Sequence, residues 1–326
     1  MVSPEFFHGV LPGTLSRFTE KQLERYSSLG EARLLRARCL SGAFLGVASQ
    51  SRKVEITLAV RGRARQNPDL DLEVDGVPVR SIRLNLDQET QQITVALAEF
   101  SESREREIRV YLPVAQEVEV ADFTPDGEPL KKPGKKLLCL GDSITQGMDA
   151  TSPACTYPVV LARLLDAELL NQGVGGQTFD ELTLDARLPF PADFVTVAYG
   201  VNDWYQGLFL KEIEAAVCAY LKKLKQIFPQ AFLVVITPLW TVLENQVKNA
   251  GTLQSVRDLL MEKTQAAGCL PVSGLTLVPH DPFYFVDGLH PNETGHLLYG
   301  LNLYRQLKRC VRRLEEKNGC EKSSGN

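Results

Sequence analysis

The stretch of sequence that decides the fold is residues 137–145, LLCLGDSIT. Its first four residues, Leu137–Leu140, form an uninterrupted apolar run, which is typical of a parallel strand covered on both faces. Gly141 breaks the run and a Gly-Asp-Ser turn follows, so that Ser143 stands at the carboxyl end of the predicted strand. Because active sites of open α/β sheets form beyond this end of the strands, Ser143 is the first candidate functional residue.

The second half of the chain repeats this pattern. Further apolar runs occupy residues 168–170, 194–199 and 232–237. Segments with helical periodicity occupy residues 157–166, 210–228, about 246–267 and 293–316. Buried strands that alternate with helices predict a parallel sheet in a layered α/β domain.

The first half of the chain has a different periodicity. Apolar and polar residues alternate in residues 53–60, 70–74, 81–86, 92–97 and 107–112, and residues 33–40 and 117–121 are counted as further strands. Alternation with period two is typical of antiparallel strands with one buried face, and this many short strands favours a jelly-roll-like β-sandwich. A segment rich in proline, glycine and charge at 124–134 interrupts both patterns. We therefore predict two domains, residues 1–133 and 134–326.

Composition and charge limit the classes of function. The 326 residues include 36 basic and 40 acidic side chains, which give a net charge of −4. Nucleic acids and anionic membranes are bound by basic surfaces, so the sequence disfavours both as partners. No apolar stretch is long enough to cross a membrane, and the N-terminus lacks a secretory signal pattern. Seven cysteines without a Cys-x-x-Cys pair fit reduced thiols in a cytoplasmic protein.

Three more segments place polar residues after predicted strands or before the last helix. Residues 171–178 (NQGVGGQT) and 200–203 (GVND) each follow a strand, and residues 287–291 (DGLHP) lie near the C-terminus. The Gly-x-Ser-x-Gly elbow and the phosphate-binding glycine loops are absent from the sequence. Together with the Gly-Asp-Ser turn, these blocks resemble the SGNH hydrolases, the GDSL-type esterases and lipases, over about residues 136–316. The resemblance implies a flavodoxin-like three-layer α/β/α domain.

The resemblance also implies chemical roles. A serine hydroxyl needs a base to become nucleophilic, and imidazole suits that role near neutral pH. His290 is the expected base, and Asp287 is the carboxylate that orients its ring, which completes a triad with Ser143. The oxyanion of the reaction is expected to be bound by the backbone N–H groups of Ser143 and Gly176 and by the side-chain amide of Asn202.

Each assignment has a simpler alternative. The Gly-Asp-Ser turn can be an ordinary helix cap, and Asn202 can be an ordinary turn residue. Trp204 follows the segment 200–203, and Trp240 follows the end of the apolar run 232–237. Contact with substrate and packing in the core are equally good interpretations of both. The other histidines, which lack the Asp-x-x-His context, are His8, His280 and His296.

The sequence thus predicts a serine esterase that cleaves a carboxylic ester through an acyl-enzyme on Ser143, without a metal or a cofactor. Family members in which a β-sandwich precedes the hydrolase domain include carbohydrate acetylesterases and a natural-product acyltransferase. This resemblance implies a small-molecule ester with a short acyl group such as acetyl, carried by a carbohydrate or another alcohol. The alternatives are an acyltransferase with the same acyl-enzyme and a non-catalytic carbohydrate-binding protein. Three roles stay open for the β domain: a wall of the cleft, self-association into a homo-oligomer, or carbohydrate binding.

Overall fold

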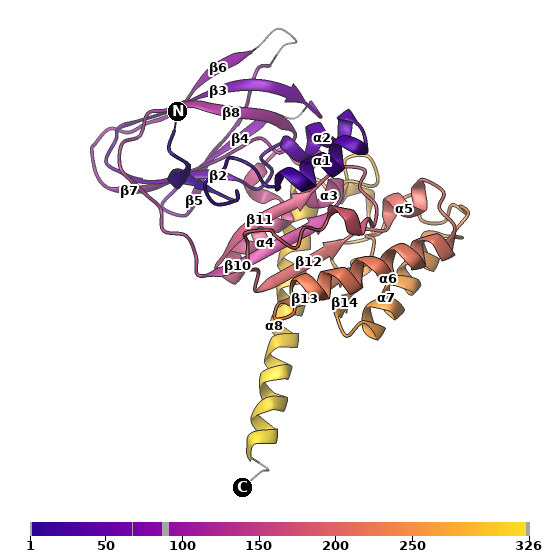
Figure 1. Ribbon diagram of the computed structural model, residues 1–326. Helices are drawn as coiled ribbons and strands as arrows, with labels where there is room; N and C mark the ends of the chain where they lie inside the picture. The colour runs from indigo at the N-terminus through magenta and orange to yellow at the C-terminus, as the bar shows by residue number, and fades with distance from the viewer. Residues whose placement is uncertain (1, 67, 87–90, 324–326) are drawn as a thin grey trace.

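The computed structural model describes residues 2–66, 68–86 and 91–323, with side chains up to residue 309. The first part of the chain forms two antiparallel sheets (Figure 1). One has the strand order β1-β2-β7-β4-β5, with β9 paired to β2, and the other has the order β6-β3-β8. The strands are β1 Phe7–His8, β2 Phe44–Ser49, β3 Lys53–Arg63, β4 Asp69–Val74, β5 Val77–Arg83, β6 Gln92–Glu99, β7 Arg106–Tyr111, β8 Gln116–Phe123 and β9 Glu128–Pro129.

One apolar core lies between the two sheets. Val54, Ile56 and Leu58 of β3 face Leu72 of β4 and Val110 of β7 within a single cluster of buried side chains. The alternation in the sequence therefore records strands with one face in this core and the other outside it. The predicted β-sandwich is confirmed.

Two helices that precede most of the sandwich strands pack elsewhere. α1 (Glu20–Ser28) begins with a capping box at Thr19, and α2 (Glu31–Arg38) follows it. The strand predicted over residues 33–40 is wrong, because residues 33–38 are all Ala, Leu or Arg, which are strong helix formers, and the segment includes no β-branched residue. The two helices pack onto the loop that follows residues 167–173, a strand of the parallel sheet described below. The contact is a small buried cluster of Phe18, Tyr26, Ala37 and Val174.

The later strands form a parallel sheet. Its order is β11-β10-β12-β13-β14, and each described pair is parallel. In this flavodoxin-like order the switch point lies beside the first strand of the sheet, so a crevice is expected at the carboxyl end of β10. The strands are β10 Lys135–Gly141, β11 Ala167–Gly173, β12 Phe194–Ala198, β13 Phe232–Ile236 and β14 Leu270–Val272.

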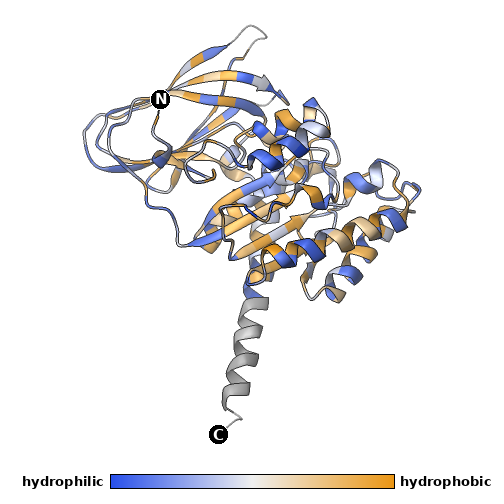
Figure 2. Ribbon diagram, in the orientation of Figure 1, coloured by the Kyte–Doolittle hydropathy of each residue, from blue (hydrophilic) through white to orange (hydrophobic). Residues whose placement is uncertain are grey.

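Helices cover both faces of the parallel sheet. Leu138 and Leu140 of β10 belong to the core shared with α6 and α7, whereas Leu137 and Cys139 belong to the core shared with α4 and α8. Figure 2 shows the corresponding concentration of hydrophobic residues on the strands between these layers. The helices are α3 Ser143–Gln146, α4 Tyr157–Leu165, α5 Val201–Tyr205, α6 Leu210–Ile227, α7 Leu253–Ala266 and α8 Glu293–Ser323. The predicted three-layer fold is confirmed, although α7 begins later than its predicted start near residue 246 because a turn with Gly251 at φ +86° precedes it.

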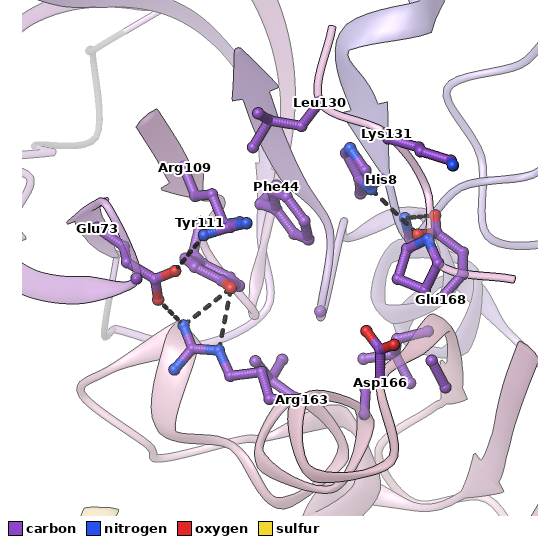
Figure 3. A pocket seen from close by; sticks show the side chains of 18 residues that line it. His8, Phe44, Glu73, Arg109, Tyr111, Leu130, Lys131, Arg163, Asp166 and Glu168 are labelled. Carbon is purple, nitrogen blue, oxygen red and sulfur yellow. Dashed lines mark hydrogen bonds and ion pairs between the residues drawn. The ribbon is translucent and has the colours of Figure 1, made fainter. Parts of the chain in front are cut away.

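A cavity of about 320 Å³ lies between the sandwich and the parallel sheet, at the amino end of β11 (Figure 3). Its charged side chains come from both parts of the molecule, and several of them are paired. Glu73 of β4 accepts hydrogen bonds from Arg163 of α4 and from Arg109 of β7, the latter at 2.9 Å. Glu168 of β11 lies 3.0 Å from His8 Nδ1. These pairs join the two sheet systems.

Three further observations complete the fold. Among the described residues, no helix is both long and apolar enough to cross a bilayer. The five cysteines with described side chains are free. The domain boundary at residue 133 stays a prediction, because α1 and α2 come from the first part of the chain but pack against the second.

Candidate active site

Ser143 occupies the first turn of α3, directly beyond the carboxyl end of β10. Asp142 caps this short helix, since its Oδ1 accepts a hydrogen bond from Ile144 N at 3.0 Å. The turn requires glycine at 141, where an added Cβ would lie only 1.9 Å from Thr145 Oγ1. Sequence and packing thus fix the serine at the switch point of the sheet.

His290 reaches Ser143 from the loop before α8. Its Nε2 lies 2.8 Å from Ser143 Oγ, and its Nδ1 lies 2.8 Å from Asp287 Oδ2. A carboxylate can only accept a hydrogen bond, so Nδ1 carries the proton and Nε2 is left to accept from the serine hydroxyl. The histidine is 6 % exposed and the serine 7 %, so this contact is largely shielded from water.

Asp287 is fixed by the turn that it begins. Its Oδ1 accepts hydrogen bonds from the backbone N–H of Leu289, at 3.0 Å, and of His290, at 2.8 Å. Partial burial alone would raise the pKa of Asp287, but the hydrogen bonds from His290 and Leu289 outweigh it and hold the pKa below its usual value. Thr241 Oγ1 donates to Gly288 O at 2.8 Å, which ties the turn to the segment after β13. The loop therefore presents an ionised carboxylate to the ring.

The three predicted oxyanion donors lie on segments that gather at the same edge of the sheet. Gly176 follows β11 and has φ +81°, a conformation that favours glycine. Within the described residues, neither Ser143 N–H nor Gly176 N–H has a hydrogen-bond acceptor. Asn202, at the start of α5, donates from Nδ2 to Gln177 O at 3.1 Å and to Asp142 Oδ2 at 3.4 Å. Two backbone donors are thus available to a ligand, and the amide is held beside them.

Two further carboxyl groups, those of Asp142 and Asp149, lie at this edge of the sheet. Burial raises the pKa of Asp142 to about 7, because the side chain is 3 % exposed and its charge is poorly solvated. Asp149 Oδ2 lies 3.5 Å from His290 Nδ1. Asp149, Asp287 and His290 have donor atoms within 4.8 Å of one another, which is the spacing of a metal site. The same contacts orient the imidazole ring, and His290 Nε2 already faces Ser143.

The two tryptophans have different environments. Trp204 is 1 % exposed, packs in the core of the α6 and α7 layer, and donates from its indole N–H to Gly251 O at 2.9 Å. The packing interpretation of Trp204 therefore describes the structure, and the substrate-pocket interpretation does not. Trp240 is partly buried and stacks on His280, with ring centroids 6.0 Å apart. Its place in a substrate pocket stays a prediction.

Two arginines of α2, the helix in a segment predicted as a strand, lie over the glycine loop that follows β11. Arg36 Nη1 donates to Gly175 O at 2.9 Å, and Arg33 Nη1 donates to Gln177 Oε1 at 2.9 Å. About 140 residues separate these arginines from the loop in the sequence, so no local pattern could reveal the contact.

Comparison with solved structures shows how widely this architecture is shared. A salicylyl-acyltransferase from a tetracycline biosynthetic pathway aligns with a TM-score of 0.75 and 18 % identity, covering 95 % of this chain and 97 % of that one. A protein described as a GDSL-like lipase from Bacteroides ovatus aligns with a TM-score of 0.78 and 17 % identity, covering 94 % and 95 %. A family two carbohydrate esterase from Clostridium thermocellum aligns with a TM-score of 0.65 and 17 % identity, covering 83 % and 93 %. At these identities the likeness shows the fold alone.

Comparison of sequences identifies the family. No curated protein matches the sequence. Residues 139–298 match the model of the GDSL-like Lipase/Acylhydrolase family, and this range spans the segments that carry Ser143, Gly176, Asn202, Asp287 and His290. The predicted family and its enzyme class, the carboxylic ester hydrolases, are confirmed. The α/β domain of this chain thus matches the GDSL-like lipase/acylhydrolase family.

Proposed function

We propose that the protein is a serine esterase that works through an acyl-enzyme on Ser143. The observation that carries this proposal is the unbroken hydrogen-bonded series from Asp287 through His290 to Ser143, in which both contacts measure 2.8 Å. This series ends beside two backbone N–H groups that have no acceptor among the described residues. A nucleophile, a base and vacant donors in one place are the parts that acyl transfer requires.

In the first step, Ser143 Oγ attacks the ester carbonyl while His290 Nε2 takes the hydroxyl proton. Asp287 stabilises the resulting imidazolium and keeps its ring oriented. The negative charge on the carbonyl oxygen is bound by Ser143 N–H, Gly176 N–H and the Asn202 amide. His290 then gives its proton to the departing alcohol, the C–O bond breaks, and the acyl group stays on Ser143.

In the second step, water replaces the alcohol. His290 removes a proton from the water, which attacks the acyl-serine carbonyl through a second oxyanion held by the same donors. The serine oxygen leaves and recovers a proton from His290, and the carboxylic acid is released. The step needs no redox partner, and the residues named here supply every proton transfer.

For the substrate, we propose an ester with a short acyl group such as acetyl, carried by a carbohydrate or another small molecule. Structural neighbours with the same two-part architecture include the carbohydrate esterase from Clostridium thermocellum, which was solved with cellohexaose. A β-sandwich also precedes the α/β domain in this chain, and α1 and α2 bring residues of the first part of the chain to the site. The support is architectural, so the acyl length needs a direct measurement.

An acyltransferase is the second candidate. The salicylyl-acyltransferase aligns over 95 % of this chain, which is more than the carbohydrate esterase covers. Both reactions pass through the same acyl-enzyme, and only the acceptor in the second step differs. Product analysis with and without added alcohols separates them: an esterase releases free acid in both cases, and an acyltransferase forms a new ester.

The deciding experiment measures hydrolysis of p-nitrophenyl acetate, butyrate and octanoate by the wild-type protein and by Ser143→Ala. We expect activity on acetate to exceed that on octanoate, and we expect Ser143→Ala to be inactive on all three. Ser273→Ala is a matched control, because this serine N-caps a 3-10 helix far along the chain and takes no part in the proposed chemistry. Activity that persists in Ser143→Ala would refute the nucleophile, and a preference for octanoate would refute the short acyl group.

A further inference from the structure

We propose that Arg33 and Arg36 form an anion subsite beside Gly176, so that the preferred ester carries a carboxylate or a similar anionic group in addition to the ester bond. This inference rests on the proposed esterase function and narrows its substrate class. The subsite is supplied by α2, a helix from the first part of the chain. It would give that part of the chain a role in choosing the substrate.

The position of the two guanidinium groups is the first argument. A Cβ built on Gly176 would lie 3.4 Å from Arg36 Nη1 and 3.5 Å from Arg33 Nε. Both arginines therefore flank the residue whose backbone N–H is a proposed oxyanion donor. An ester carbonyl bound at Gly176 N–H would place the adjoining part of the substrate within reach of these side chains.

The lack of compensating charge is the second argument. Neither Arg33 nor Arg36 forms an ion pair with a described residue, and each donates one hydrogen bond to an uncharged oxygen. A guanidinium has five N–H donors, so most of those on Arg33 and Arg36 have no partner among the residues that the structure describes. Both side chains are only partly exposed, and a partly buried cation with free donors favours an anionic ligand.

The surrounding charges make Arg36 the stronger anion-binding candidate of the two arginines. Its pKa is lowered by burial and then by the like charges of Arg65 and Arg33. Burial also lowers the pKa of Arg33, but the nearby carboxylates of Asp180 and Asp203 act in the opposite direction. Asp180 already forms an ion pair with Arg25 at 2.8 Å. Asp203 is buried, and its Oδ1 accepts a hydrogen bond from Phe179 N at 3.1 Å. No carboxylate therefore neutralises Arg36 directly.

The shape of the group favours a carboxylate. Two guanidinium groups present planar forks of N–H donors, and a planar carboxylate matches such a fork with two parallel hydrogen bonds. The charge can lie on the acyl part, as in a hemiester of a dicarboxylic acid, or on the alcohol part, as in an acetyl ester of a hydroxybenzoate. The two arms of the experiment distinguish these sources.

The competing explanation is structural, namely that the arginines only dock α2 onto the loop after β11. That role needs one hydrogen bond from each side chain and no charge. This structural role predicts that replacing an arginine lowers kcat/KM equally for neutral and anionic esters. An anion subsite instead predicts a loss that is confined mainly to the charged ester.

The experiment measures kcat/KM for p-nitrophenyl acetate, p-nitrophenyl hemiglutarate and 4-acetoxybenzoate. For each variant, the ratio of the value for a charged ester to the value for the neutral ester is compared with the wild-type ratio. We expect Arg36→Gln to lower this ratio about 10-fold for one of the charged esters and Arg33→Gln to lower it less. Arg38→Gln is the matched control, because Arg38 lies on the same helix, is half exposed and faces Glu117 at 3.9 Å. Its ratio should equal that of the wild type.

Two further measurements protect against a variant that fails to fold. Arg36→Lys keeps the charge but loses the planar fork, so its ratio should lie between those of the wild type and Arg36→Gln. In the wild-type protein, raising the salt from about 20 to about 200 mM should lower kcat/KM for the charged ester more than for the neutral one, because salt screens exposed charge pairs. Ratios that do not respond to either glutamine variant or to salt would overturn the subsite. Such a result would leave the esterase proposal intact, whereas activity in Ser143→Ala would refute that proposal separately.

Discussion

The two edges of the parallel sheet differ in how their polar groups are partnered. At the amino edge, the interdomain cavity contains polar side chains that contact one another, such as Glu73 with Arg163 and Glu168 with His8 (Figure 3). At the carboxyl edge, the N–H groups of Ser143 and Gly176 have no acceptor among the described residues. Buried polar groups are normally satisfied, so donors without acceptors indicate a place where a ligand completes the set.

The comparison separates a structural role from a chemical one. The contacts of Glu73 and Glu168 join the two sheet systems and stabilise one arrangement of them. Vacant donors next to a serine and a histidine contribute nothing until an oxyanion forms, and they are then fully oriented. The cavity has the larger space, but the carboxyl edge has the groups that can do chemistry.

The largest expected effect tests the carboxyl edge. Asp287→Asn should lower kcat by about 10⁴-fold, because an amide cannot accept the Nδ1 proton of His290 in the same way and the ring loses its productive tautomer. Steady-state kinetics with p-nitrophenyl acetate measure this loss. Asp149→Asn is the matched control, since its carboxylate lies 3.5 Å from the same nitrogen instead of 2.8 Å, and it should cost less than 10-fold. A larger loss for Asp149→Asn than for Asp287→Asn would exchange the roles of the two carboxylates.

The next effect tests the oxyanion donors. Asn202→Ala should lower kcat by about 10²–10³-fold with little change in KM, because the amide is most useful when negative charge develops. The same kinetic assay gives both constants. If only KM changes, Asn202 binds the substrate in its ground state and does not stabilise the oxyanion.

The third effect tests the amino edge. Glu73→Ala should lower the free energy of unfolding by about 2–3 kcal/mol, because it leaves Arg109 and Arg163 without their shared carboxylate. The figure is below the usual range for buried pairs because Arg163 is 37 % exposed and solvent screens part of its charge. Urea denaturation measures the change, and kcat should stay at the wild-type value. Glu107→Ala, which removes an exposed partner of Arg109, should change stability by less than about 0.5 kcal/mol. Equal effects of the two variants would contradict the structural role of the cavity pairs.

Sequence patterns predicted which residues lie at the carboxyl edge of the sheet better than they predicted the tertiary contacts around that edge. The ends of β10 at Gly141 and of β12 at Ala198 lie within one residue of the ends of the apolar runs, whereas β11 continues to Gly173, three residues beyond the run that ends at Leu170. The polar residues after these strands are close because parallel strands end at one edge. The burial of Trp204 could not be predicted from the sequence, because the exposed fraction of its side chain depends on packing against α7 and not on its neighbours in sequence. The helix over Arg33 and Arg36 was missed because a few alternating residues fit either period. Its contact with Gly176 is a tertiary fact that no local pattern encodes.

The smallest expected effect concerns a second histidine near the proposed triad. His296 is fully buried, accepts a hydrogen bond at Nδ1 from Tyr157 N at 3.4 Å, and has no partner at Nε2 among the described residues. Burial, together with the nearby His290, lowers the pKa of His296 from its ordinary 6.5 to about 3. Below pH 6.5 the unfolded chain therefore binds a proton that the folded chain does not, and stability falls as the pH falls.

Between pH 6.5 and pH 5 this linkage amounts to about 1.6 kcal/mol, because the unfolded histidine is half protonated at pH 6.5 and the full slope is 1.36 kcal/mol for each pH unit. His296→Asn should remove it, because the amide oxygen can still accept from Tyr157 N but does not titrate. Asp142 and Asp203, whose pKa values burial raises to about 7 and about 6, contribute an opposite slope, and both proteins share it. The difference between wild type and variant in urea denaturation at the two pH values therefore isolates His296. An unchanged difference would mean that His296 takes up a proton in the folded state, and that the carboxyl edge is more open to water than its burial indicates.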